Sequence, residues 1–173
     1  FYTRSGATIG KAIVSLRLGE LRSMEGNADS ALIMFSNADD AFEKAGSKEG
    51  MAKAKLELAK IHAKKKNYKL ASDYLTVAAS LTVQPDLAWQ IEFSKGTIEE
   101  STAEFDSAFQ SYKKSIAIID RMRGNISTEE FKTLFANAKV EVYDKMIALL
   151  LSNKVKGLGR EQAIPYAFDY NEQ

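Results

Sequence analysis

Few side chains in this chain are suited to catalysis or metal binding, because it has one histidine and no cysteine. Without cysteine there is no thiolate nucleophile, thiolate metal ligand or disulfide, and one histidine is too few for a zinc or iron site. The densest carboxylates are Glu99, Glu100, Glu104 and Asp106, which we interpret as a solvated acidic rim rather than a catalytic pair. His62 is expected to be a packed or half-exposed side chain. The sequence therefore predicts no catalytic residue, no metal site, no cofactor and no enzymatic activity.

Basic residues gather at one place, close to a predicted turn between two helices. They are Lys60, Lys64, Lys65, Lys66 and Lys69. A nucleic-acid binder normally has a marked basic excess, whereas this chain has 24 basic and 23 acidic residues and a net charge of +1. We therefore interpret the lysines as a solvated turn and predict no nucleic-acid partner. No apolar run approaches the roughly 18–20 residues that span a bilayer, so no membrane partner is predicted either.

The composition is typical of one globular domain of 173 residues, with 45% hydrophobic and 27% charged residues. Only two prolines are present, alternating strand patterns are absent, and Ala, Lys, Glu and Leu dominate the periodic stretches. These features predict an all-α fold in a single domain covering residues 1–173. Because both ends look cut, we expect a piece of a longer protein. The compartment stays unknown, with the cytoplasm favoured by the lack of cysteine, signal peptide and membrane segment.

A pattern of small and large residues recurs along the chain and predicts stacked units. Its three copies are Leu18-Gly19, Ala31, Phe35 and Ala38; Leu58-Ala59, Ala71, Leu75 and Ala78; and Lys95-Gly96, Ala108, Tyr112 and Ser115. The step from Leu18 to Leu58 is 40 residues and that from Leu58 to Lys95 is 37. Small residues let two helix backbones approach closely, with the larger residue filling the space beside them.

The register predicts four helix pairs, covering residues 7–46, 47–83, 84–123 and 127–173. The first helix is expected over about residues 7–23. Asn27 or Asp29 is expected to cap the second helix and Ser47 the third, while Pro85 fits the first turn of the fifth. Residues 127–130 read as a capping box that opens the seventh helix. Proline in the first turn of the eighth helix would make Ala167 the small residue of the last pair, after a longer loop.

This arrangement resembles the tetratricopeptide repeat (TPR), a helix–turn–helix unit of roughly 34 residues. The resemblance implies an α-solenoid of about four antiparallel helix pairs, that is, a TPR-like superhelix. The tyrosine expected four residues after the first leucine is replaced by Arg22, His62 and Glu99. The resemblance therefore indicates the fold and does not specify a partner.

The last third of the chain shows a second resemblance, to the repeat segment that precedes CHAT domains, which are caspase-like cysteine peptidases. It rests on residues 119–124, on 141–151 with Val142-Tyr143, and on 167–173 with Ala167, Tyr170 and Glu172. The resemblance implies a regulatory or substrate-recruiting arm for a peptidase lying beyond Gln173. The His/Cys pair of such a peptidase has no counterpart here.

The inner wall of a helical solenoid comes from the first helix of each pair, and such walls bind extended or helical peptides. The register predicts these peptide-contacting residues: Leu16, Glu20, Met24, Lys53, Leu56, Lys60, Lys64, Gln90, Phe93 and Thr97. TPR modules that clamp a C-terminal carboxylate have Lys and Asn where this chain has Leu16 and Glu20, so we exclude that ligand class. The leading hypothesis is a non-catalytic protein-interaction module. A foreign peptide and an adjacent domain of the same chain are both open as the occupant.

Overall fold

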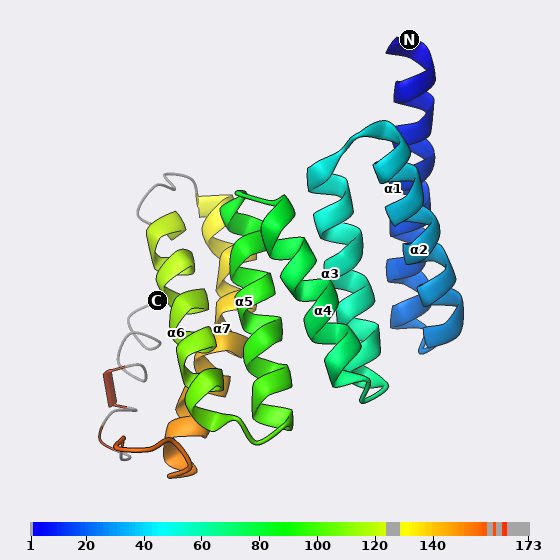
Figure 1. Ribbon diagram of the computed structural model, residues 1–173. Coiled ribbons are helices and arrows are strands. Elements are labelled where there is room, and N and C mark those ends of the chain that lie inside the picture. Colours follow the sequence, from blue (N-terminus) through cyan, green and yellow to red (C-terminus); the bar gives the residue numbers. More distant parts are fainter. Residues whose placement is uncertain (1, 124–128, 159–160, 162–163, 166–173) are drawn as a thin grey trace. The chain divides into compact units, whose positions relative to one another are not determined.

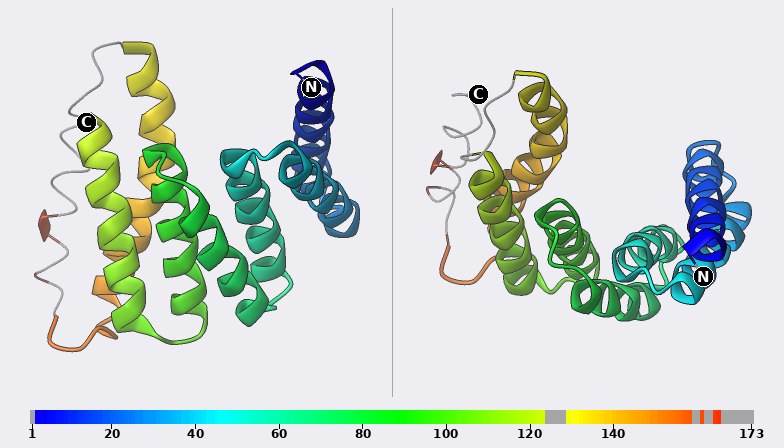
Figure 2. Two further views of the ribbon diagram at one scale, coloured as in Figure 1. Left: turned by 45° about the horizontal axis from the view of Figure 1, so that its top comes forward. Right: turned by 90° about the horizontal axis from the view of Figure 1, so that it is seen from above.

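The computed structural model of the protein is built from α-helices joined by short turns (Figures 1 and 2). It describes the backbone of residues 2–123, 129–158, 161 and 164–165, and the side chains of residues 6–122, 140–158, 161 and 164–165. The helices are α1 (Tyr2–Met24), α2 (Ala28–Ala45), α3 (Lys48–Lys64), α4 (Tyr68–Leu81), α5 (Pro85–Ser101), α6 (Phe105–Arg123) and α7 (Glu129–Leu151). These residues contain no strand, and none of their helices is long and apolar enough to cross a membrane. The all-α prediction is confirmed.

The chain divides into two compact units, residues 1–87 and 88–173, with the boundary in the first turn of α5. In the first unit α1 pairs with α2, α3 pairs with α4, and α2 packs on α3. In the second unit α5 is joined to α6 by side-chain hydrogen bonds, and α6 packs on α7. Within each unit, helices joined by a described connection run antiparallel, because these connections are only two or three residues long.

The predicted starts of α2, α3 and α5 agree with the structure, whereas α1 begins at Tyr2 rather than near residue 7. Asn27 is the N-cap of α2 and its side chain accepts from Ser30 N at 3.1 Å, while Ser47 caps α3 by accepting from Gly50 N at 3.3 Å. Asn67 stands at the N-cap position of α4 without a side-chain hydrogen bond. Pro85 is the first residue of α5, a position whose N–H would have no partner within the helix, so proline loses no hydrogen bond there.

Several helices end in the same hydrogen-bonded turn, with one residue in the left-handed region. Gly26, Gly46, Lys66 and Ala103 have φ between 62° and 78°. At the end of α5, Ala103 N bonds Glu100 O at 3.1 Å and Glu104 N bonds Glu99 O at 2.8 Å. This pair of bonds is a Schellman motif, which satisfies carbonyls that the helix end leaves free. Left-handed φ is strained for a residue with a Cβ, so Ala103 and Lys66 are less favourable here than glycine.

The recurring small residues lie where the second helix of a pair presses a large ring against the first. A Cβ placed on Gly19 would stand 2.5 Å from Phe35 Cε1, and one on Gly96 would stand 2.5 Å from Tyr112 Cδ1. Both Phe35 and Tyr112 are fully buried. The repeat therefore places a small residue of the first helix against a large residue of the second, as the spacing predicts. In the second pair Ala59 and Leu75, also fully buried, occupy the equivalent positions.

Each unit has its own apolar core. The core of the first unit joins α1, α2 and α3 through residues that include Leu16, Phe35, Phe42 and Leu58. The core of the second unit is built from α6, α7 and the loop after α7, with Trp89 of α5 packed against it. Ser115 Oγ of α6 donates to Trp89 O at 2.9 Å, which fixes the start of α5 on α6.

The fourth helix pair is only partly within the described residues. Its first helix, α7, ends at Leu151, and no helix is formed over residues 154–158. The predicted longer loop stays a prediction. The expected capping residue Ser127 and the expected small residue Ala167 lie outside the described residues, as does most of the range expected for an eighth helix.

Replacing Gly19 with alanine should destabilise the protein by about 1–3 kcal/mol, because the new Cβ would collide with the buried Phe35 ring. Gly6→Ala in the same helix is the matched control, since nothing lies within 4 Å of its Cβ position. This control should stabilise by about 0.5–1 kcal/mol through helix propensity alone. Denaturant unfolding followed by circular dichroism measures both. Equal stability of the two variants would contradict the close packing.

Ala103→Gly should raise the free energy of unfolding by about 0.5–1 kcal/mol, because it removes the strain of a left-handed alanine at a small entropic cost. Ala117→Gly, on the exposed side of α6, should instead lower it by about 1 kcal/mol. Opposite signs in the same unfolding experiment are the expected outcome. Two changes of the same sign would show that the turn is not strained.

Candidate protein-interaction surface

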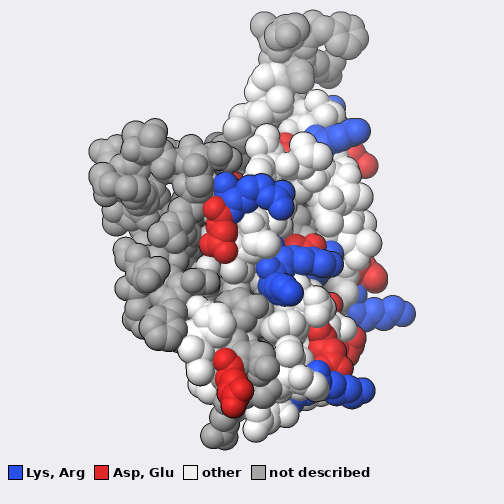
Figure 3. Space-filling view, turned by 90° about the vertical axis from the view of Figure 1, so that its left-hand side faces the viewer, with Lys and Arg blue, Asp and Glu red and all other residues white. Residues whose placement is uncertain are grey.

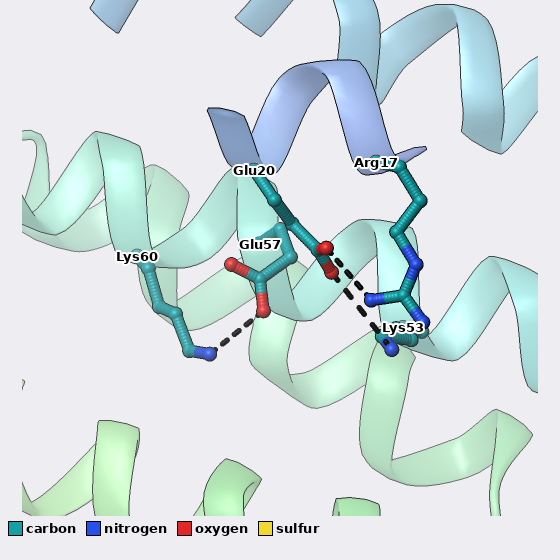
Figure 4. Close-up of polar contacts among 5 residues, drawn as sticks. All are labelled: Arg17, Glu20, Lys53, Glu57 and Lys60. Carbon is teal, nitrogen blue, oxygen red and sulfur yellow. Dashed lines mark hydrogen bonds and ion pairs between the residues drawn. The ribbon is translucent and has the colours of Figure 1, made fainter. Parts of the chain in front are cut away.

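In the first unit, α1 and α3 carry a surface of interleaved charges, defined here as the α1–α3 charged face: Arg17, Glu20, Lys53, Glu57 and Lys60 (Figure 4). Arg17 Nη1 lies 2.8 Å from Glu20 Oε2, and Lys53 Nζ lies 3.8 Å from Glu20 Oε1. Lys60 Nζ contacts Glu57 Oε1 at 2.7 Å. The Lys53–Glu20 pair crosses from α3 to α1, so the face continues over both helices.

The charged face is half-exposed rather than buried. The side chains of Glu20, Lys53 and Lys60 are 28%, 37% and 36% exposed, and that of Glu57 is 18% exposed. Ion pairs this close to water each contribute roughly 0–1 kcal/mol. A charged ligand could therefore break these ion pairs and pair with the same side chains itself, at little cost in free energy.

The structure places two of the predicted contact residues inside the protein. Leu16 is 4% exposed and belongs to the core of the first unit, and Leu56 is fully buried. They are not available to a ligand, and their inclusion in the surface is corrected here. Met24, by contrast, is 86% exposed at the end of α1, and Lys64 is exposed at the end of α3.

The predicted residues of α5 belong to the second unit and are half-buried. Phe93 packs against Tyr112 with ring centroids 5.8 Å apart, and Thr97 Oγ1 donates to Ser94 O at 2.8 Å. Gln90 also has an interaction within the protein. Their participation in peptide binding stays a prediction.

Sequence reasoning missed Arg17 and Glu57, which complete the charged face. Both stand at equivalent positions, 40 residues apart, between the predicted residues of α1 and α3. Their opposite charges conceal this equivalence, because one repeat has a basic residue where the next has an acidic one. An i, i+3 pairing of Arg17 with Glu20 and of Glu57 with Lys60 was the signal available in the sequence.

Two acidic residues expected in a solvated rim instead join helices of the second unit, and that expectation was wrong for them. Glu99 accepts from Ser111 Oγ at 2.7 Å, and Glu100 accepts from the Tyr112 hydroxyl at 2.8 Å. Lys145 Nζ of α7 lies 3.3 Å from the same Glu100 carboxylate. Burial, together with the bond to Glu100, raises the pKa of Tyr112. The carboxylates are therefore used in packing α5, α6 and α7.

His62 is half-buried and stacks on Tyr74 of α4, with ring centroids 5.6 Å apart and an interplanar angle of 13°. Its Nδ1 is buried without a hydrogen-bond partner among the described residues. Burial, and secondarily the charge of Lys65, lowers the pKa of the imidazole. These contacts describe a neutral packing residue, as expected from the sequence.

The lysines at the α3–α4 turn have different surroundings. Lys65 Nζ lies 2.6 Å from Asp29 Oδ1 at the start of α2, while Lys64, Lys66 and Lys69 are exposed. Figure 3 shows one face of the molecule, on which basic and acidic side chains are interspersed among uncharged residues. Among the described residues no group of three or more His, Asp or Glu side chains is arranged to hold a metal ion.

Comparison with known proteins is informative about the fold. No family model matches the chain, and no curated protein matches it. The crystal structure of MamA, a TPR-containing protein, aligns with 94% of this chain and 91% of its own, with a TM-score of 0.50 and 16% sequence identity. The fold is that of a TPR-like helical repeat. This confirms the predicted fold class, the α-solenoid, while an identity this low is informative about the fold alone.

The predicted resemblance to the segment that precedes CHAT domains has no support from these comparisons. Of the residues on which it rests, Ile119, Val142 and Tyr143 are buried in the core of the second unit. Tyr143 also donates to Asp120 at 3.0 Å. Packing alone therefore accounts for them. Ala167, Tyr170 and Glu172 lie outside the described residues, and the CHAT association stays a prediction.

His62 should make the stability depend on pH in one direction. Because the folded pKa is lower than the unfolded value of about 6.5, the unfolded state takes up the proton first as pH falls. Stability conferred by neutral His62 is therefore complete above about pH 7 and decreases below about 6.5, down to the folded pKa. Urea unfolding near pH 7.5 and near pH 5 measures this loss. His62→Phe, which keeps a ring against Tyr74, should show a smaller loss, and an equal loss would contradict the assignment.

Proposed function

We propose that this chain is a protein-interaction module that binds a peptide on the α1–α3 charged face. The single observation that carries the proposal is the row of half-exposed charges shared by the first helices of two successive pairs (Figure 4). The TPR-like fold supports a protein ligand in general terms, because stacked helix pairs present such faces to peptides.

The charges define the chemistry of the ligand. The face carries three basic and two acidic residues, and Lys53 and Lys60 are already paired with Glu20 and Glu57. A purely acidic peptide would be attracted by the lysines but repelled by the carboxylates of Glu20 and Glu57. A peptide that carries both signs would satisfy both sets, so a mixed-charge peptide fits better than the acidic partner that the lysines alone indicate.

Apolar contacts would come from the edge of the face. Ile13 is 45% exposed and Met24 is 86% exposed on α1. Methionine adapts to ligands of different shape because its side chain is unbranched and polarisable. The proposed ligand is thus a mixed-charge peptide with at least one apolar side chain.

The test is selection of peptides from a random phage-displayed library on the purified chain, followed by affinity measurement with the selected peptides. The double variant Lys53→Ala/Lys60→Ala should lower the affinity at least ten-fold, about 1.4 kcal/mol. Lys69→Ala is the matched control, since this exposed lysine lies on α4, and it should leave the affinity unchanged.

The circular dichroism of all variants should match that of the parent chain, because the altered lysines are half-exposed or exposed. If the selected peptides bind the double variant as tightly as the parent chain, the peptide-binding site is not the α1–α3 charged face. A selection that enriches no peptide over an unrelated helical protein would contradict the proposed function.

A further inference from the structure

The outer face of α1, defined here by Gly10, Val14, Leu18 and Leu21, is apolar and open to solvent. Val14, Leu18 and Leu21 are 59%, 41% and 48% exposed. They follow one another at four and three residues, so they form one stripe along the helix. The opposite side of α1, which includes Ala12 and Leu16, is buried in the core of the first unit.

The equivalent stripe of α3 is covered. The 40-residue repeat step takes Val14, Leu18 and Leu21 to three residues that are 0–2% exposed and belong to the core shared with α2, namely Ala54, Leu58 and Ile61. The same repeat positions are thus exposed on α1, whereas on α3 they are covered by α2.

The glycines carry a second, independent observation. Gly50 of α3, which has the position of Gly10, lies so close to the Phe42 ring of α2 that no Cβ would fit between them. Nothing lies within 4 Å of the Cβ position of Gly10. A glycine in a helix interior costs about 1 kcal/mol relative to alanine, and at Gly10 no contact within the described residues offsets that cost. An aromatic ring could therefore pack on Gly10 as Phe42 packs on Gly50.

We infer that the outer face of α1 is a docking surface for an amphipathic helix of the α2 type, belonging to a further helical repeat and carrying a phenylalanine opposite Gly10. The occupant is specified by the α2–α3 interface already present in this structure. In that interface α2 supplies Phe42 to the glycine of α3, and the aliphatic residues of α3 pack beside it. This inference is independent of the α1–α3 charged face, which involves other side chains of α1.

The test supplies such a helix in the register of the existing interface. A second copy of residues 1–47 is fused directly to Thr8 of the chain, so that its α2 precedes α1 as α2 precedes α3. The reporter is Leu18→Cys in the downstream copy, which is unambiguous because the chain has no cysteine. Its rate of reaction with a thiol reagent should be at least ten-fold lower in the fusion than in the unfused chain.

Matched variants separate docking from other effects. Downstream Gly10→Ala should restore fast labelling in the fusion, because its Cβ would occupy the place of the ring, and upstream Phe42→Ala should do the same. Upstream Gly6→Ala should leave labelling slow, since nothing lies within 4 Å of its Cβ position and it changes helix propensity alone. The reporter Val77→Cys on α4, with 43% exposure close to that of Leu18, should react equally fast in the fused and unfused chains.

Three results would overturn the inference. One is unchanged labelling at position 18 in the fusion. Another is slow labelling that Gly10→Ala does not relieve. A third is labelling in the unfused chain that slows with concentration, together with a dimer in sedimentation, because a second copy would then be the occupant.

Discussion

A small residue of one helix against a large side chain of the next is the contact on which the described fold depends. Gly19 receives Phe35 within the first pair, and Gly96 receives Tyr112 within the third. Each contact brings two helix axes closer than residues with side chains allow, and the close approach buries the neighbouring alanines completely. Gly50 applies the same device between pairs, where it receives Phe42. Small residues therefore determine both how a pair closes and how one pair joins the next.

This constraint explains why the fold could be predicted from the sequence. Gly19, Ala31, Phe35 and Ala38 stand out because size, rather than hydrophobicity alone, is restricted at each position, and their spacing is fixed by the geometry of two antiparallel helices. Turn residues such as Asn27 and Ser47 are similarly informative because capping needs a particular side-chain oxygen. The Gly50–Phe42 contact escaped notice because it joins two repeats and does not recur within each one.

The candidate surface was less predictable because a repeat register gives a position but not its neighbours. Leu16 and Leu56 occupy positions that the register assigns to the inner wall, yet both are buried. Likewise Glu100 looked like a surface carboxylate until the Tyr112 hydroxyl and Lys145 were found beside it. Both misplacements arise from the rotation of a helix about its axis, which a few residues of periodicity determine only approximately.

The position of Trp89 has a consequence for optical experiments on this protein. It is the only tryptophan in the chain, and it packs against the core of the second unit while its carbonyl is held by Ser115. Indole emission therefore reports on residues 88–173 directly, whereas the helices of residues 1–87 contain no indole. Unfolding can be followed both by indole fluorescence and by far-ultraviolet circular dichroism, which reports on all helices. Different midpoints in the two transitions would show that the two units unfold as separate cooperative blocks.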